Sequence, residues 1–302
     1  MEVVSLFSGC GGTDLGFEKA GHQVIWSNEI DVTACNTYKD NMGFSPVCGD
    51  IKNQFDFPKA ELLVGCYPCQ GFSLYGKRSK EDPRNFLFRE FSRALKHVQP
   101  KYFVTENVKG LLFGFGLRIY EDMIKEFRDL GYDTYTNTVN AKYYGIPQDR
   151  ERVFIVGMRK DLFRQYEFPK RTHGSSLRRI LVLKDAIGEM SPPSEDEVYA
   201  ASYSSHYMSR NRKRKWNEVS YTIQASGRHA PMHPSGSPMI HIGKDKWAFG
   251  DGPNRRLSYK ECARLQTFPS NYYFSGTLDE KYRQIGNAVP PLLAKAVAES
   301  FQ

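Results

Sequence analysis

The chain has 302 residues, and 42 Lys and Arg against 34 Asp and Glu give it a formal net charge of +8, which permits a polyanionic partner without requiring one. Its composition, 40% hydrophobic and 25% charged residues, excludes collagen, coiled coil and wholesale disorder and is typical of a globular protein with one large or two modest domains. No apolar run reaches the roughly 18 residues of a membrane span, residues 1–5 do not begin a secretory signal, and six cysteines are too few for a disulfide scaffold, so we expect a cytoplasmic protein with reduced thiols.

In the first half of the chain, short apolar runs alternate with segments of helical spacing. The pattern predicts strands at residues 3–7, 24–27, 46–48, 62–65, 101–105, 134–140 and 152–158, and helices at 13–20, 85–97 and 117–130. Strands that alternate with helices of this length favour an α/β fold with a doubly wound, mostly parallel sheet. Two more helices are predicted at 258–266, after a Ser cap, and at 290–301, where Pro stands at the start.

Residues 161–256 have a different composition, richer in Ser, Pro, His and basic residues and with weak periodicity. A basic run at 210–215 places five positive charges in six residues, and an acidic stretch at 195–197 follows two prolines. We interpret this region as a second, smaller domain. The predicted boundaries are 1–178 plus 282–302 for the first domain, and 179–281 for the second domain with its hinge.

Polar or small residues follow the predicted strands at the point where each strand ends. These residues are Gly9, Glu29, Asp50, Cys69 and Glu106. Open α/β sheets bind their ligands at the carboxyl ends of the strands. The repetition therefore predicts a site at this edge of the sheet.

The first of these strand ends is a glycine-rich turn, residues 7–12, which leads into a helix. Glycines let the backbone approach a ligand closely, and a helix N-terminus favours anionic groups. The G-x-G-x-x-G pattern is incomplete because position 14 is Asp, so a plain tight turn is an equal alternative. With Glu29 placed to bind ribose hydroxyls, the turn indicates an adenosine-containing cofactor without choosing between NAD and S-adenosylmethionine.

Cys69 lies in a turn with Pro68 and Gly71, a setting that suits an exposed nucleophile. The alternatives are a structural thiol or a redox pair with Cys66, and no second ligand pair supports a zinc site.

Arg150 and Arg152 alternate at strand spacing, so both are expected to point to one face, where two guanidiniums would flank the thiol. The alternative is a solvated charge run. Residues 284–290 form either a turn or a segment that returns the chain to the sheet.

Taken together, these pieces resemble the DNA (cytosine-5)-methyltransferases of the compact bacterial restriction–modification type. The motifs occur in the family's order over nearly the whole chain, while residues 165–255 match only in outline, where the family carries its variable target-recognition region. The matching segments are 7–12, 28–29, 49–51, 68–73, 106–108, 148–152, 256–257, 261–266 and 286–289.

The resemblance implies transfer of a methyl group from S-adenosylmethionine to C5 of a flipped-out cytosine in a specific short sequence of double-stranded DNA. It implies that Cys69 attacks C6, that Glu106 holds or protonates N3 and that Arg152 engages the O2 carbonyl. Arg150 is the candidate for the positive charge beside the thiolate. No metal is expected.

The resemblance also assigns the remaining site residues. Phe7 would stack on adenine, Glu29 would take the ribose hydroxyls, and Asp50 with Ile51 would read the edge of adenine. The full set for the cofactor is Phe7, Ser8, Gly9, Cys10, Gly11, Gly12, Glu29, Ile30, Asp50, Ile51, Pro68, Leu87, Asn287 and Ala288. The set for DNA is Gln70, Ser73, Arg84, Arg210, Arg212, Lys213, Arg214 and Lys215. We expect a monomer that acts on double-stranded DNA and shares its site with a cognate restriction endonuclease.

Three other readings of the sequence stay open. Methylation of a tRNA cytosine would use a similar Cys and Glu-Asn-Val set. An NAD-dependent dehydrogenase would use the glycine turn and Glu29 but leaves Cys69 and Glu106 without roles. An inactive DNA-binding module is opposed by the intact set of Cys69, Glu106 and Arg152.

Overall fold

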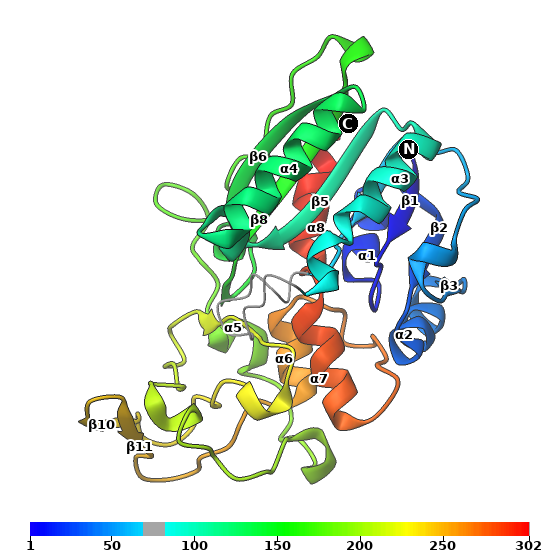
Figure 1. The fold of residues 1–302 in the computed structure, drawn as a ribbon. Helices are drawn as coiled ribbons and strands as arrows, with labels where there is room; N and C mark the ends of the chain where they lie inside the picture. The colour runs from blue at the N-terminus through cyan, green and yellow to red at the C-terminus, as the bar shows by residue number, and fades with distance from the viewer. Residues whose placement is uncertain (69–81, 302) are drawn as a thin grey trace. The chain divides into compact units, whose positions relative to one another are not determined.

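The computed structural model describes residues 1–68 and 82–301, and it divides the chain into two compact units. Unit 1 comprises Met1–Asn140, Glu151–Lys170 and Ala294–Gln302, and unit 2 comprises Ala141–Arg150 and Arg171–Leu293. Figure 1 shows the order of the elements along the chain. Within the described ranges, no helix combines the length and the apolar character that crossing a membrane requires.

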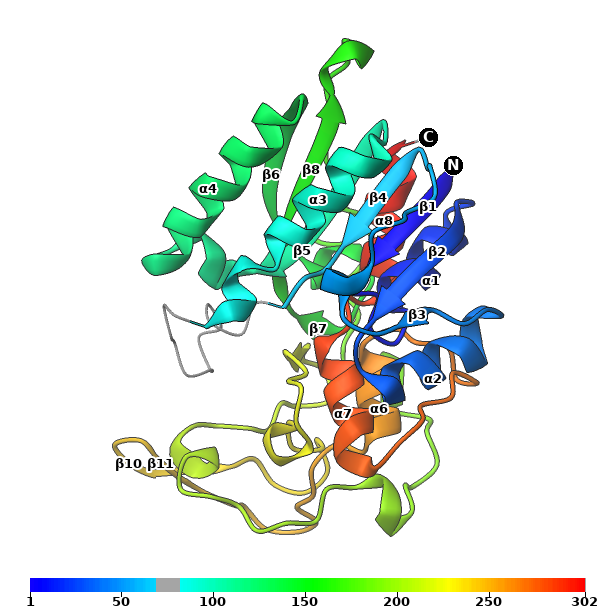
Figure 2. The ribbon, with the colours of Figure 1, turned by 45° about the vertical axis from the view of Figure 1, so that its right-hand side comes forward.

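Unit 1 is built on a sheet in which seven strands of the described chain take the order β3-β2-β1-β4-β5-β8-β6 (Figure 2). The five strands from β3 to β5 are parallel, and β8 runs antiparallel to both of its neighbours. The predicted doubly wound, mostly parallel sheet is confirmed. The strand bounds are β1 Glu2–Leu6, β2 Gln23–Glu29, β3 Val47–Cys48, β4 Leu62–Gly65, β5 Tyr102–Val108, β6 Tyr132–Asn140 and β8 Glu151–Arg159.

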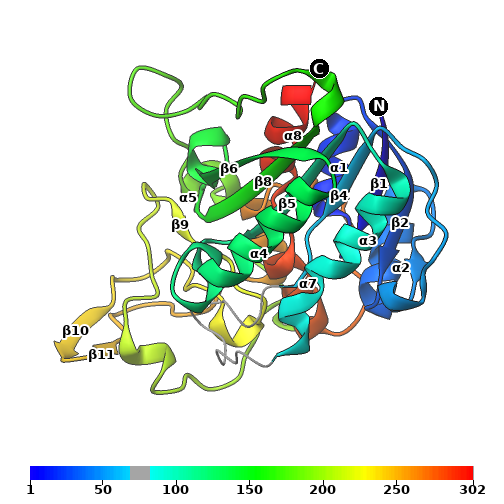
Figure 3. The ribbon, with the colours of Figure 1, turned by 45° about the horizontal axis from the view of Figure 1, so that its top comes forward.

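Helices cover both faces of this sheet (Figure 3). On one face lie α3 (Phe88–Val98) and α4 (Phe115–Asp129), and α1 (Gly12–Lys19) lies on the other. The rings of Phe91 and Phe127 pack against Phe103 of β5, with centroids 5.7 and 4.7 Å apart, and these aromatic residues form the centre of the core. The last turn of α8 (Pro291–Ala298) joins unit 1 through a contact between the His22 ring and the carbonyl oxygen of Ala298.

One helix of unit 1 was not predicted. It is α2 (Val32–Met42), which follows β2 directly. The carboxylate of Asp31 caps it by accepting hydrogen bonds from the amides of Thr33 and Ala34, and Gly43 ends it in the left-handed region at φ 78°. The hydroxyl of Tyr38 then donates to Asp14 at 2.8 Å and so ties α2 to α1.

The strand order of unit 1 reverses between β1 and β4. From β1 the chain moves outward through β2 to β3, and it then returns to β4 on the other side of β1. Segments that leave the carboxyl ends of β1 and β4 therefore diverge, which opens the crevice where doubly wound folds bind ligands. The glycine turn follows β1, and Cys66 to Pro68 follow β4.

Residues 141–150 leave unit 1 and return to it at adjacent positions. In the β6–β8 ladder Asn140 is the register partner of Glu151, so the last residue before the excursion and the first residue after it lie side by side.

Unit 2 contains little regular structure. It has three short helices, α5 (Leu183–Ile187), α6 (Tyr259–Leu265) and α7 (Leu278–Asn287), among the residues described. Strand β7 (Gln148–Asp149) pairs with β9 (Ser220–Tyr221), and β10 (Ile240–Gly243) pairs with β11 (Lys246–Ala248). The assignment of residues 179–281 to target recognition stays a prediction.

Helix α6 confirms the predicted Ser cap, since Ser258 and Glu261 form a capping box. The helix α7 was missed. It begins at a second capping box, Thr277 with Glu280, and its last turn includes Gln284, so the start of the expected turn at 284–290 is helical.

Short 3₁₀ turns complete both units. They are η1 Ile51–Asn53, η2 Pro83–Phe86, η3 Lys109–Leu112, η4 Ala141–Tyr144, η5 Lys160–Leu162, η6 Glu195–Glu197, η7 Tyr207–Ser209, η8 Gly227–His229 and η9 Glu299–Phe301.

Candidate functional site

In the glycine turn after β1, every second residue from Phe7 to Gly11 has a left-handed backbone conformation. Phe7, Gly9 and Gly11 have φ values of 56°, 55° and 87°. Glycine takes this conformation without steric cost, but it is unusual for a bulky residue such as Phe7. The turn is closed by a hydrogen bond from the amide of Gly11 to the carbonyl of Ser8 at 3.0 Å. The surrounding backbone thus holds Phe7 in a strained conformation at the end of β1.

The carboxylate of Glu29, at the end of β2, holds this turn from the side. One oxygen accepts a hydrogen bond from the amide of Gly9 at 2.8 Å, and the other accepts from the amides of Ile30 and Asp31, both at 2.9 Å. Burial raises the pKa of Glu29 above its ordinary value, and these amide donors act in the opposite direction. Glu29 therefore links the strand ends of β1 and β2 at the predicted cofactor site.

A cavity of about 200 Å³ opens at this edge of unit 1. Six predicted cofactor residues, and Arg84 from the predicted DNA set, line it; Asn28 and Lys52, which were not predicted, complete the lining. The lining residues are Phe7, Asn28, Ile30, Asp50, Ile51, Lys52, Pro68, Arg84 and Leu87. The chain thus brings together residues from four strand ends around one cavity.

Asn28 belongs to the matching segment 28–29 and directly precedes Glu29 at a strand end, but it was not assigned to the site. Its side-chain amide donates to the carbonyls of Val47 and Gly49 at 2.8 and 2.9 Å. It therefore fixes the backbone that leads into Asp50.

The other predicted cofactor residues have different positions. Ser8, Cys10 and Gly12 are buried in the turn and at the start of α1. Asn287 is the last residue of α7 and Ala288 is its C-cap, and both belong to unit 2. Their part in cofactor binding stays a prediction.

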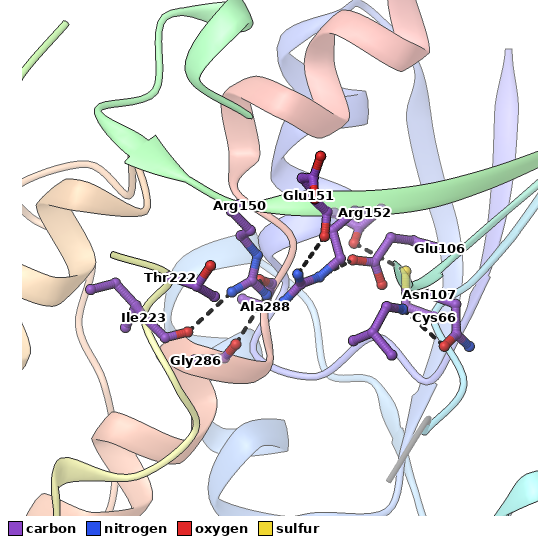
Figure 4. Close-up of polar contacts among 12 residues, drawn as sticks. Cys66, Glu106, Asn107, Arg150, Glu151, Arg152, Thr222, Ile223, Gly286 and Ala288 are labelled. Atoms are coloured by element: carbon purple, nitrogen blue, oxygen red, sulfur yellow. Dashed lines mark hydrogen bonds and ion pairs between the residues drawn. The ribbon is translucent and has the colours of Figure 1, made fainter. Parts of the chain in front are cut away.

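Glu106 and Arg152 meet at the end of β5 (Figure 4). The Nε atom of Arg152 lies 2.9 Å from Oε1 of Glu106, and the two side chains are only 13% and 11% exposed. Glu106 lies on β5 and Arg152 on β8. The antiparallel register places Arg152 opposite Val108, two residues from Glu106, which brings the two side chains together. A second guanidinium nitrogen, Nη1 of Arg152, donates to the carbonyl of Glu151 at 2.7 Å. The structure thus joins the two residues that were predicted to act on the same ring.

Cys66 occupies the end of β4 beside this pair. Its sulfur lies 3.5 Å from the hydroxyl of Thr13. Burial, and then the charge of Glu106, raise the pKa of the Cys66 thiol, which favours a protonated, unreactive thiol. Cys69, Gln70 and Ser73 lie outside the described residues, so the predictions for them are not tested, but Pro68, which precedes Cys69, lines the cavity.

The strand spacing from which Arg150 and Arg152 were predicted to point to one face is wrong, because Arg150 lies between β7 and β8. Arg150 lies just before β8, in unit 2, and is 1% exposed. Its guanidinium donates to the carbonyl of Ile223 at 3.1 Å and to those of Gly286 and Ala288 at 3.0 and 2.9 Å (Figure 4). These contacts support a structural role, as a donor that joins two separate backbone segments of unit 2, one at Ile223 and one at residues 286–288.

The basic run 210–215 also differs from its prediction as a uniform DNA-contact surface. Arg212 and Lys213 are 6% and 5% exposed. Arg212 donates to the carbonyls of Tyr207 and His206, and the ammonium of Lys213 donates to two carbonyls and to Oδ1 of Asn254 at 2.7 Å. Because both cations are turned inward to these oxygens, the structure contradicts phosphate contacts by these two residues.

The rest of the run is closer to the surface. Arg214 packs over the ring of Tyr221 at 4.1 Å and pairs with Glu218, while Arg210 and Lys215 are exposed. Contacts of these three residues with DNA stay a prediction. So does the predicted phosphate contact of Arg84, which lines the cavity and pairs through two nitrogens with Asp82.

Comparisons with known proteins agree with this geometry. Residues 1–302 match the family described as C-5 cytosine-specific DNA methylase. The chain is 45% identical to Type II methyltransferase M.BsuRI of Bacillus subtilis, over 99% of this chain and 78% of that protein. It is 42% identical to Type II methyltransferase M.FnuDI of Fusobacterium nucleatum, over 100% and 94% of the two chains. The structure of the S. pombe Dnmt2 methyltransferase has the same fold, with a TM-score of 0.70, 19% identity and coverage of 99% and 96%. The resemblance predicted from the motifs is confirmed, and the chain belongs to the C-5 cytosine-specific DNA methylase family, a family of methyltransferase enzymes.

Proposed function

We propose that this enzyme transfers a methyl group from S-adenosylmethionine to C5 of a flipped-out cytosine in a specific short sequence of double-stranded DNA, through a covalent bond between Cys69 and C6. In the cell this modification would protect DNA from a cognate restriction endonuclease. One observation carries the proposal. The cavity at the switch point of the sheet and the buried pair of Glu106 and Arg152 lie at neighbouring strand ends of unit 1.

The residues around the cavity fit the chemistry of S-adenosylmethionine. Phe7, Ile30 and Leu87 provide apolar surface for an aromatic base, and Asp50 provides a polar edge. The oxygens of Glu29 accept backbone amides and still carry lone pairs, which suit the hydroxyls of a ribose. When bound, S-adenosylmethionine would supply an electrophilic methyl group.

The proposed roles at the base follow from where charge develops. The Cys69 thiolate would add to C6, which places negative charge on N3 and O2 of the ring and makes C5 nucleophilic. The carboxyl group of Glu106 would hold or protonate N3, and the guanidinium of Arg152 would engage O2. The contact of 2.9 Å between the two side chains fixes both before the base arrives. After C5 is methylated, loss of its proton would return the electron pair to the ring and expel the thiolate.

This chemistry requires the base to leave the helix, since C5 and C6 are stacked between neighbouring bases in a duplex. The proposal therefore includes flipping of the cytosine. Sequence recognition would fall to unit 2, where Arg210 and Lys215 offer exposed positive charge.

The first experiment incubates the protein with S-adenosylmethionine labelled in its methyl group and with either duplex DNA or tRNA. Label on C5 of cytosine in duplex DNA is expected. The variant Cys69→Ala should lose turnover by at least about a thousandfold, because it has no nucleophile, and should still bind the cofactor. Transfer to tRNA in preference to DNA, or normal turnover by Cys69→Ala, would refute the proposal.

A second experiment tests the covalent step. Duplex DNA with 5-fluorocytosine in place of cytosine offers a C5 substituent that cannot leave as a cation, so the adduct with Cys69 should persist after methyl transfer. We expect a protein–DNA complex that survives denaturing electrophoresis and depends on S-adenosylmethionine. Cys69→Ala should give none, and a complex of equal yield with that variant would assign the nucleophile elsewhere.

A further inference from the structure

One wall of the cavity is a short stretch of irregular backbone. Asp50, Ile51 and Lys52 line the cavity, and they lie in and just before the 3₁₀ turn η1. The turn holds itself together with few bonds, among them one from the amide of Lys52 to Oδ1 of Asp50 at 3.0 Å. So short a turn is not rigid on its own, and its geometry depends on groups outside it.

A guanidinium from α3 supplies such groups. Nη2 of Arg93 donates to the carbonyl of Ile51 at 2.8 Å, and Nη1 donates to the carbonyl of Gln54 at 2.6 Å. The remaining nitrogen, Nε, donates to Glu90, which lies one turn earlier on the same helix, at 2.8 Å. Both ends of η1 are therefore tied to one side chain, which is itself held by its own helix.

The same guanidinium also lies over two aromatic rings. Its carbon lies 5.4 Å from the ring centroid of Phe55 and 5.4 Å from that of Phe57. Phe57 is buried in the core, and the Ile51 side chain is buried beside it. The planar fork of Arg93 thus donates to three acceptors through three nitrogens while its carbon lies over two rings, an arrangement that an ammonium cannot reproduce.

We propose that Arg93 is a positioning residue of the cofactor pocket, which fixes the wall formed by Asp50, Ile51 and Lys52 and thereby sets the affinity for S-adenosylmethionine. The inference rests on the proposed function, since it takes that cofactor as the occupant of the cavity. Asn28 acts from the opposite end, because it holds Val47 and Gly49 just before the wall begins. Arg93 itself does not line the cavity, so its effect passes through the backbone.

The test compares Arg93→Met and Arg93→Lys with Lys96→Met in the full chain. Lys96→Met is a matched control, since it removes an exposed positive charge from the same helix without touching η1. Calorimetry measures the Kd for S-adenosylmethionine and for S-adenosylhomocysteine. Steady-state kinetics on duplex DNA measure kcat and the KM of each substrate.

We expect Arg93→Met to raise the Kd and the cofactor KM roughly tenfold or more, because two charge-assisted hydrogen bonds to the wall are lost. At saturating cofactor, kcat and the KM for DNA should stay within about twofold of the wild type. Arg93→Lys can reach one carbonyl at a time and should give an intermediate Kd. Lys96→Met should match the wild type.

Two results would overturn this inference but not the proposed function. The first is that Arg93→Met binds the cofactor as tightly as the wild type does. The second is that kcat, DNA affinity and melting temperature all fall together in Arg93→Met, which would indicate a general structural role. If Arg93→Met does not fold, Arg93→Lys carries the same test with a smaller shift. A wild type that binds neither cofactor form would overturn the proposed function, and this inference with it.

Discussion

The two units of this enzyme use buried polar side chains for different purposes. In unit 1, strands and helices satisfy most of the backbone, and the carboxylates of half-buried Glu29 and buried Glu106 stand at strand ends around the candidate site. In unit 2, where regular elements are few, buried cations donate to carbonyl oxygens that no ladder satisfies. Arg150 and Lys213 are the main cases. Backbone carbonyls must find donors wherever they are buried, so a buried positive charge in unit 2 is first a structural element.

Arg256 follows the same rule in unit 2. It is 1% exposed, donates to the carbonyls of Tyr199 and Ala201, and lies 4.0 Å from the ring of Tyr203. The comparison shows that the net positive charge of this chain does not by itself identify a nucleic-acid-binding surface, because some of the cationic side chains are buried and bind backbone carbonyls.

The largest effect should come from Glu106, whose proposed role is in catalysis and not in stability. Glu106→Gln keeps the size of the side chain and an acceptor for Arg152 but cannot deliver a proton to N3. We expect kcat to fall on the order of 10²–10⁴-fold, with the free energy of unfolding within about 1 kcal/mol of the wild type. Methylation kinetics and urea unfolding measure the two quantities.

Arg150→Met is the counterpart for unit 2. It removes the Arg150 hydrogen bonds to three carbonyls, of which only that of Ala288 has a second side-chain donor among the described residues, Gln266, so we expect the free energy of unfolding to fall by about 3 kcal/mol. A stable Arg150→Met variant that is inactive would reverse the assignment and return Arg150 to the catalytic group.

Lys213 and Lys215 sharpen the comparison inside one basic run. Lys213→Met should lower the free energy of unfolding by about 2–3 kcal/mol, since it leaves Ser235, Ser237 and Asn254 oxygens without a donor. Lys215→Met should leave stability within about 0.5 kcal/mol and, if Lys215 contacts DNA, reduce the salt dependence of binding by about one ion. Urea unfolding and binding isotherms at several salt concentrations check both. Equal stability of the two variants would show that burial of Lys213 is unimportant.

Two pH dependences of opposite sign also distinguish the units. Burial raises the pKa of Asp14 in unit 1 to about 6, although Ser5 and Tyr38 donate to it. Between about pH 4 and pH 6 the folded chain keeps a proton that the unfolded chain releases, so stability falls as pH rises, by roughly 3 kcal/mol in all. Burial lowers the pKa of His233 in unit 2 to about 4, so its contribution is lost as pH falls from about 6.5 to 4.

Unfolding by urea from pH 4 to 8 tests this contrast with Asp14→Asn and His233→Gln. Relative to the wild type, Asp14→Asn should gain stability as pH rises through the lower window, and His233→Gln should gain as pH falls. If the free energy of unfolding of both variants changes with pH as that of the wild type does, the pKa of neither Asp14 nor His233 is shifted by folding.

Much of unit 1 could be predicted from the sequence, because its signals are local. A short apolar run followed by Gly9 or Glu29 identifies both the strand and the residue at its end, and the hydrogen bond from the amide of Gly9 to the carboxylate of Glu29 shows that these two ends meet. Three helices were missed: α2, α5 and α7. For α2 and α7 a capping signal was present, Asp31 before α2 and the Thr277-x-x-Glu280 capping box before α7.

Unit 2 could not be predicted in the same way. The alternation of Arg150 and Arg152 would place both on one face only in a continuous strand, and the chain breaks between β7 and β8. The acceptors of Arg150 come from residues 223, 286 and 288, which are remote in sequence. In a sequence, a buried cation is indistinguishable from an exposed one.

The pairing of Asn140 with Glu151 has a consequence for assembly of the chain. Strands β6 and β8 pair from the two residues that flank the loop 141–150, so closing this loop costs little entropy. The β6–β8 hairpin can therefore form before the distant segments of unit 2 fold. The strand pair that carries Arg152 would then be in place early. Changes within residues 141–150 should alter how unit 2 is stabilised while leaving the folding order of this strand pair as it is.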